Sequence, residues 1–261
     1  MDWSRIKSIF ILTFFILNVY LAYQFFNVRD AAKYEYIKEA SFEEKLKNDD
    51  IQYKDLPKEQ EKTQYISVKP KQFLESELPE REGELQTLRN GGTLLEVIFE
   101  NPIKLPSKFD PTQFSAYIKQ NIENGDQYTF WEKNDVNRTI TFYQQSEGRT
   151  FYQNIYGKLI FTFNEDGGIV SYQQTFLEVN EQLGEKQELL SALRAIETLY
   201  NRGLLEPKSE ITKIELGYAT IVQLSASQQV LAPTWRFVIN GEENLYVHAF
   251  EGQVIQFGEE I

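Results

Sequence analysis

The sequence has 261 residues and a formal net charge of −12. It contains no cysteine, which excludes disulfides, thiol catalysis and thiolate metal sites. The acidic balance argues against binding nucleic acid or anionic lipid through the overall field of the protein. The 15 Tyr and 19 Phe residues favour β-rich structure, because aromatic side chains suit half-buried strands.

The first element is an uncharged apolar run at residues 9–26. As a helix this run is about 27 Å long, close to the hydrocarbon thickness of a bilayer. Its end has no small-x-small pattern, which disfavours a cleaved signal peptide, and it has no polar face, which disfavours a buried core helix. We expect a cytoplasmic tail at residues 1–8, a single transmembrane helix at residues 9–28 and an extracytoplasmic remainder, because Arg5 and Lys7 favour a cytoplasmic N-terminus.

Three polar side chains interrupt the apolar run: Thr13, Asn18 and Gln24. In lipid an amide seeks another polar group, and a hydrogen bond between helices is worth roughly 0.6–2 kcal/mol. These residues are therefore candidate contacts with another transmembrane helix. The alternative is that Asn18 is hydrated near the interface or bonded to its own backbone, and the sequence leaves both readings open.

After the span, the pattern predicts a juxtamembrane helix at residues 29–49. Ser41 followed by Glu44 matches a capping box, so a second helix is expected to restart there. Residues 50–64 are polar and predict a loop. The next expected elements are a strand at 64–69, a short helix at 72–77, and a hairpin of strands 84–89 and 93–100 across the Asn-Gly-Gly turn at 90–92.

The rest of the chain repeats one order, a helix followed by an antiparallel meander. The first helix begins at Asp110-Pro111 and ends at Gly125, and the second covers residues 185–202. The expected strands are 127–133, 138–145, 149–154, 158–164 and 168–177, and then 210–224, 233–239, 244–250 and 253–257. The predicted class is therefore α+β. It contains two helix-plus-antiparallel-sheet units, residues 29–180 and 181–261, after the transmembrane helix.

Residues that could carry chemistry are few. His248 is the only histidine, and without a second histidine or any cysteine a packed strand histidine is favoured over a metal ligand. Acidic pairs such as Glu242-Glu243 lie in turns, where they are usually solvated. Trp131 and Trp235 are candidates for stacking on a sugar or for filling the core, and the core is favoured. The sequence predicts no catalytic residue, metal or cofactor.

The N-terminus carries a family resemblance. The opening Met-Asp-Trp-Ser at residues 1–4, the basic Arg5 and the apolar helix ending in Tyr-Gln-Phe-Phe at residues 23–26 resemble the start of the YycI family of Firmicutes. The later segment Pro-Thr-Trp-Arg-Phe at 233–237, continuing to residues 253–255, is similar to the closing hairpins of that family.

The resemblance implies a function that composition does not. YycI-like proteins lie in the membrane beside a related partner, YycH, and together they modulate the sensor histidine kinase WalK, which controls cell-wall metabolism through WalR. The family has no catalytic motif to carry over, so the resemblance implies a non-enzymatic regulator in the cell membrane of a Gram-positive bacterium. The alternatives are an extracytoplasmic binding module for a cell-wall fragment or peptide and, last, an exported hydrolase.

Overall fold

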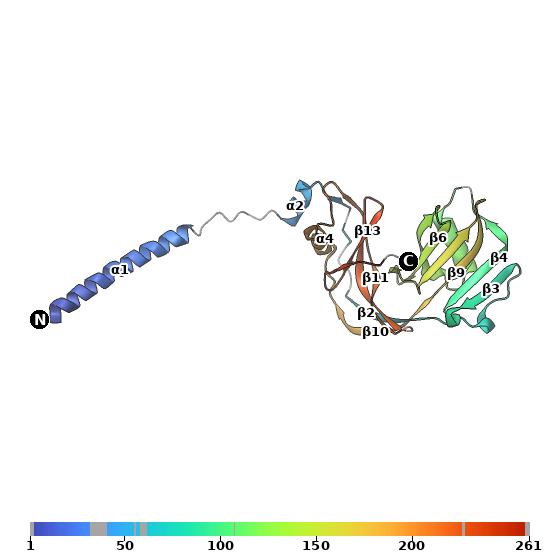
Figure 1. Ribbon diagram of the computed structural model, residues 1–261, viewed down its shortest axis with the longest axis horizontal. Helices are drawn as coiled ribbons and strands as arrows, with labels where there is room; N and C mark the ends of the chain where they lie inside the picture. Colours follow the sequence, from blue (N-terminus) through green and yellow to red (C-terminus); the bar gives the residue numbers. More distant parts are fainter. Residues whose placement is uncertain are drawn as a thin grey trace. The chain divides into compact units, whose positions relative to one another are not determined.

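The computed structural model describes residues 3–31, 41–54, 56–57, 62–106, 108–225 and 228–258. Within these ranges the chain forms four α-helices and fourteen strands, so the predicted α+β class is confirmed (Figure 1). The chain divides into two compact units, Met1–Asp49 and Asp50–Ile261, which are described separately.

The N-terminal unit contains two helices, α1 (Trp3–Ala31) and α2 (Phe42–Asn48). The capping box predicted at the start of α2 is confirmed, since the backbone N–H of Glu44 donates to Ser41 Oγ at 3.3 Å and that of Ser41 donates to Glu44 Oε2 at 3.0 Å. These bonds satisfy two backbone donors that a helix start leaves open. Residues 32–40 of the predicted helix at 29–49 lie outside the described residues.

The described large apolar side chains of α1 are exposed, from 49% at Leu17 to 74% at Trp3. The predicted span at residues 9–28 lies within this helix. Among the described residues, no helix combines the length and apolar character needed to cross a membrane.

The second unit is built mainly from antiparallel strands. The strands are β1 (Gln52–Tyr53), β2 (Thr63–Pro70), β3 (Glu84–Arg89), β4 (Leu94–Lys104), β5 (Tyr128–Asn134), β6 (Thr139–Ser146), β7 (Arg149–Tyr152), β8 (Lys158–Phe163), β9 (Gly168–Gln174), β10 (Leu177–Gln187), β11 (Glu210–Ser225), β12 (Gln228–Ile239), β13 (Glu243–His248) and β14 (Val254–Ile255). Hydrogen-bonded neighbours follow the order β10-β2-β12-β11-β7-β6-β8-β9-β4-β3, with β1, β5, β13 and β14 attached beside this path.

The topology joins distant parts of the sequence. Strand β2 pairs with β10 and β12, so the early segment at residues 63–70 belongs to the same group of strands as the C-terminal hairpins. Strands β1 and β7 both pair with β11 in parallel, and the other pairings are antiparallel. The predicted boundary between residues 180 and 181 falls inside β10 and stays a prediction.

Helix α3 (Pro111–Asn121) covers the strands of the first meander. Its Asp110 N-cap accepts from the backbone N–H of Thr112 at 2.8 Å, as the Asp-Pro pair predicts. Phe114 and Ile118 lie one helical turn apart and are buried in the core, where the Phe114 ring meets that of Phe161 edge-on at 4.9 Å. The helix ends four residues before Gly125, the predicted end.

Helix α4 (Ala192–Asn201) is shorter than predicted, and it contacts β13 (Figure 1). The predicted start at residue 185 is wrong, because residues 185–187 belong to β10, whose last residue Gln187 pairs with Thr63 of β2. Pairing between strands overrides the helical propensity of this charged segment. The helix starts after Ser191, whose Oγ accepts from the backbone N–H of Arg194 at 3.3 Å.

The remaining predictions differ from the structure only in detail. The hairpin across residues 90–92 is observed as β3 and β4, and its turn contains a left-handed Gly91 at φ 68°. The short helix predicted at 72–77 is a 3-10 turn, η1 (Glu75–Glu77). The predicted loop at 50–64 contains β1, which the polar composition did not indicate.

Candidate functional site

The polar side chains of α1 bond within their own helix. Asn18 Nδ2 donates to the carbonyl oxygen of Phe14 at 2.8 Å. Thr13 Oγ1 and Gln24 Nε2 donate at 3.1 and 3.0 Å to groups three and four positions earlier. The bond to Phe14 uses the amide nitrogen of Asn18 and leaves the carbonyl oxygen out of that bond. A contact of these residues with another helix stays a prediction.

The three residues do not form one polar stripe. At 3.6 residues per turn, Thr13 and Gln24 lie about 20° apart around the helix axis, and Asn18 lies about 140° from Thr13. Two different faces of α1 therefore carry polar groups. A partner helix would engage either Asn18 or the Thr13 and Gln24 face.

The two candidate tryptophans lie on opposite sides of β12: Trp235 belongs to this strand, and Trp131 belongs to β5. Trp235 is 2% exposed, and its Nε1 donates to the carbonyl oxygen of Leu190 at 2.8 Å, just before α4. Trp131 is half-buried and lies on the other side, against Arg236, because neighbouring strand residues point to opposite faces. The structure does not bring the two indoles together, and stacking of either one on a sugar stays a prediction.

Arg236 organises the surroundings of Trp131. Its guanidinium carbon lies 4.0 Å from the centre of the Trp131 ring. The same group donates through Nη1 to Glu215 Oε2 and through Nε to Asn244 Oδ1, each at 2.7 Å. This arrangement ties β5 to β11, β12 and β13. Sequence reasoning missed Arg236, and the only available signal was its place next to Trp235 on a strand.

Tyrosine rings extend this cluster toward the C-terminus. Tyr152 lies 5.4 Å from Tyr246, and Tyr246 meets Phe257 edge-on at 4.8 Å. Burial is the main cause that raises the pKa of the phenols of Tyr152 and Tyr246 above its usual range. Both phenols stay protonated at neutral pH, and their rings pack between the strands.

His248 lies at the end of β13 and is 5% exposed. Its Nδ1 accepts from the backbone N–H groups of Phe250 and Glu251, both at 3.2 Å, so the ring is neutral with the proton on Nε2. Nε2 is buried and has no hydrogen-bond partner among the residues that the structure describes. Burial lowers the pKa of His248, against a smaller opposing effect of Glu251.

The environment of His248 matches a packed histidine. Its ring lies 6.0 Å from that of Tyr65 and 6.1 Å from that of Phe250. Within the described part of the chain, no group of three or more histidine or acidic residues is placed to hold a metal ion. The described contacts of His248 hold the turn after β13.

The fold thus defines an α+β protein in which an N-terminal helical unit precedes a large unit of mainly antiparallel strands. The family model for YycI, described as YycI protein, matches residues 32–250. This chain belongs to the YycI family, and the resemblance seen at its N-terminus is confirmed by a match to the region that follows.

Solved structures show weaker likeness. An uncharacterized protein from Eubacterium rectale matches with a TM-score of 0.48 and 10% identity, covering 81% of this chain and 92% of that chain. The C-terminal domain of Bacillus megaterium YpeB matches with a TM-score of 0.38 and 10% identity, covering 73% of this chain and 89% of that chain. No curated protein matches. Both scores are too low to carry an argument about function.

Proposed function

We propose that this chain is a non-enzymatic, membrane-anchored regulator that acts together with a YycH-like partner on a WalK-like sensor histidine kinase controlling cell-wall metabolism. Membership of the YycI family over residues 32–250 is the observation that carries the proposal. The proposed partners follow from what that family is known for. The sign of the regulation is not part of the proposal.

We also propose that α1 is the membrane anchor, with residues 1–8 inside the cell and the β-rich unit outside. The support is the sequence of residues 9–26, which has 18 residues without a charge. Ile9, Phe25 and Phe26 belong to this run, although their side chains lie outside those that the structure describes. Exposed Phe10, Ile11 and Phe14 would find apolar surroundings in lipid.

The energetic demand on such a regulator is small. A coupling of roughly 1–3 kcal/mol between two sites changes the balance of a two-state protein by about 5- to 150-fold. One helix contact in the membrane together with one contact outside is enough to supply it. A regulator of this kind needs a preference for one kinase state and no catalytic group.

Co-purification from membranes tests this function. The full-length chain and a form without residues 1–30 are each expressed with a tag at the C-terminus. Proteins that come with them are identified by mass spectrometry. We expect a YycH-like protein and a WalK-like kinase with the full-length form, and loss of the kinase from the truncated form. If the full-length chain brings neither protein, the proposal is wrong.

A further inference from the structure

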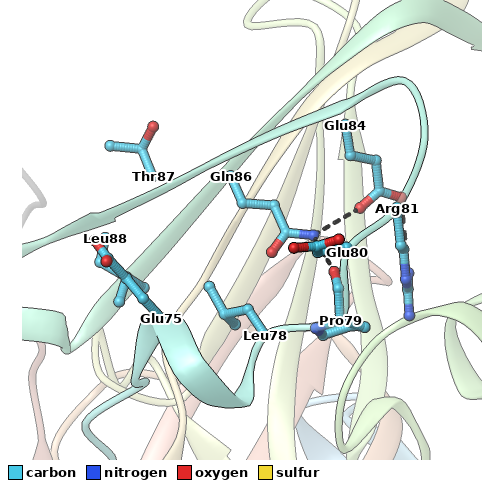
Figure 2. A pocket seen from close by; sticks show the side chains of 9 residues that line it. All are labelled: Glu75, Leu78, Pro79, Glu80, Arg81, Glu84, Gln86, Thr87 and Leu88. Atoms are coloured by element: carbon cyan, nitrogen blue, oxygen red, sulfur yellow. Dashed lines mark hydrogen bonds and ion pairs between the residues drawn. The ribbon is translucent and has the colours of Figure 1, made fainter.

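A groove runs beside β3, at one end of the strand order. The facing wall is the segment around η1, with Glu75, Leu78 and Glu80, and the β3 side contributes Glu84, Gln86 and Leu88. Figure 2 shows the Gln86 side chain reaching from the strand toward Pro79, whose carbonyl oxygen accepts from its Nε2 at 2.9 Å. The hollow has a volume of about 420 Å³, within the usual range of ligand sites.

The floor of the groove is held in place by the core. Leu78 and Leu88 are partly buried and pack against the main aromatic cluster of the unit. Arg81 donates to the carbonyl oxygen of Asn121 at the end of α3, and it lies 3.7 Å from Glu84. The two walls are therefore fixed before any ligand binds, which lowers the entropy cost of binding.

The strand that forms one wall is a sheet edge. β3 pairs with β4, and it ends the strand order. In such an edge strand, every second residue directs its N–H and C=O groups away from the neighbouring strand. Leu85, at the same edge, is 61% exposed. An extended chain can pair with this edge while its alternate side chains enter the groove.

The charge of the groove indicates the partner's chemistry. The residues that line the groove include three glutamates and one arginine, so the lining carries a net charge of −2. The arginine is Arg81, whose guanidinium is already engaged by Asn121 and Glu84. Glu75 and Glu80 are exposed at the groove. A bound chain with lysine or arginine at alternate positions would complement these carboxylates.

We infer that the groove between β3 and residues 75–81 is a binding site for an extended, basic polypeptide segment of a partner protein, which adds to the sheet as a strand beside β3. Main-chain pairing supplies affinity, and the glutamates select basic side chains over acidic ones. This inference rests on the geometry of the groove and does not depend on the proposed kinase partner.

A labelled peptide tests the inference. The probe is a fluorescein-labelled hexapeptide, Lys-Thr-Lys-Val-Lys-Thr, titrated with the full-length chain in neutral detergent and followed by fluorescence anisotropy. We expect saturable binding, and no binding of the matched Glu-Thr-Glu-Val-Glu-Thr peptide. A basic probe methylated at every second backbone nitrogen keeps its charge but cannot pair as a strand, and we expect its binding to be lost.

Charge reversal locates the site. The double variant Glu75→Lys, Glu80→Lys should weaken binding of the basic probe about tenfold, since each exposed ion pair contributes up to about 1 kcal/mol and reversal adds repulsion. The matched control is Glu181→Lys, Glu185→Lys on the edge strand β10, where both residues are also exposed. It changes the net charge equally and should leave binding within about twofold. Thermal unfolding checks that both variants are folded.

Three results would overturn the inference. The first is the absence of saturable binding of the basic probe to the wild-type chain. The second is equal weakening by the two double variants, which would indicate only general electrostatic attraction. The third is undiminished binding of the methylated probe, which would show that the peptide does not pair with the strand edge.

Discussion

Helix α1 and the core of the β-rich unit both contain phenylalanine, but they place its side chain in opposite environments. Phe10 and Phe14 on α1 are 73% and 65% exposed, whereas Phe142 and Phe161 in the sheet are fully buried at 0%. A phenylalanine is thus a surface residue in one region and a core residue in the other. Stability of the β-rich unit depends on the second pair, and any contact with lipid or a partner helix would use the first.

Polar side chains show the same division. Asn18 in α1 bonds to a group four positions earlier in the sequence. Asn154 in the β-rich unit is 4% exposed, and its Nδ2 donates to Gln229 Oε1 at 2.7 Å, across 75 positions. Polar groups in α1 are satisfied locally, so they reveal little about folding. Polar groups in the sheet depend on strands brought together by the tertiary fold.

The largest expected effect tests the aromatic comparison directly. Phe142→Ala should reduce the free energy of unfolding of the β-rich unit by about 3–5 kcal/mol, because it removes a fully buried ring and leaves a cavity. Phe14→Ala should leave that free energy unchanged. Urea unfolding of the full-length chain in detergent, followed by near-UV circular dichroism, measures both. Equal effects of the two substitutions would contradict the division.

A second prediction concerns how tightly β7 and β11 approach each other. A Cβ atom at Gly217 would lie 2.4 Å from the carbonyl oxygen of Thr150 and 2.6 Å from the Tyr152 ring. Gly217→Ala should therefore cost about 1–3 kcal/mol of unfolding free energy through overpacking. Gly258→Ala, where a Cβ atom meets open space, is the control. Differential scanning calorimetry should show a lower Tm for the first variant alone, and equal Tm values would refute the close approach.

A third prediction concerns pH. Burial lowers the pKa of folded His248 below its unfolded value of about 6.5, so the unfolded chain binds the proton more readily. The free energy of unfolding therefore keeps the full contribution of neutral His248 above about pH 6.5. Below that pH the free energy of unfolding falls, by at most about 1.4 kcal/mol per pH unit. The titratable groups beside the His248 ring are the Tyr65 phenol and the Glu251 carboxylate.

The variant His248→Asn isolates this contribution. Asparagine keeps an acceptor near the position of Nδ1 for the N–H groups of Phe250 and Glu251, but it does not titrate. The change in the free energy of unfolding between pH 7 and pH 5 should be smaller in the variant than in the wild type. The difference is the contribution of the one proton that His248 binds. Identical pH profiles of the two proteins would show that protonation of His248 does not destabilise the folded state.

The smallest expected effect concerns the helix surface. Asn18→Leu should weaken association of α1 with a membrane partner by roughly 0.6–2 kcal/mol, the range for hydrogen bonds between transmembrane helices. It should leave the Tm of the β-rich unit unchanged. Crosslinking yield in membranes measures the association, and Thr13→Val provides a comparison on the other polar face. An unchanged yield for Asn18→Leu would rule out the contact.

Local signals in the sequence predicted the local structure well. The Asn-Gly-Gly turn at residues 90–92, the Asp110 cap and the Ser41 capping box each act through neighbours within a few residues, and each is observed. The aromatic content and alternation also indicated most of the strands. These features depend on backbone conformation and capping, which a short stretch of sequence determines.

Long-range features were not predictable from single segments. Residues 185–187 read as the start of a helix because Glu185 and Lys186 favour helices, yet they form the end of β10, where Gln187 pairs with Thr63 of β2. The join of β2 to the C-terminal strands has no local signal. Arg236 was missed for the same reason, since its partners Trp131, Glu215 and Asn244 come from three other strands.

The β3 groove was also beyond the reach of the sequence. The sequence predicted only a short helix at 72–77 and a strand at 84–89 in this region, and only the fold places residues 75–81 opposite Gln86 and Leu88 beside β3, which ends the strand order. A concave site requires two walls, and here the walls are joined by a turn whose geometry the sequence did not indicate. The charge of the groove, in contrast, is visible in the sequence.

The proposed function is the regulation of a WalK-like kinase without catalysis of a reaction. A WalK-like kinase is reconstituted in vesicles with a YycH-like partner, and its autophosphorylation rate is measured with the full-length chain, with the form lacking residues 1–30, or with neither. We expect the full-length chain to change the rate about fivefold or more, and the truncated form to have a smaller effect. A rate that is the same in all three preparations would contradict the proposed function.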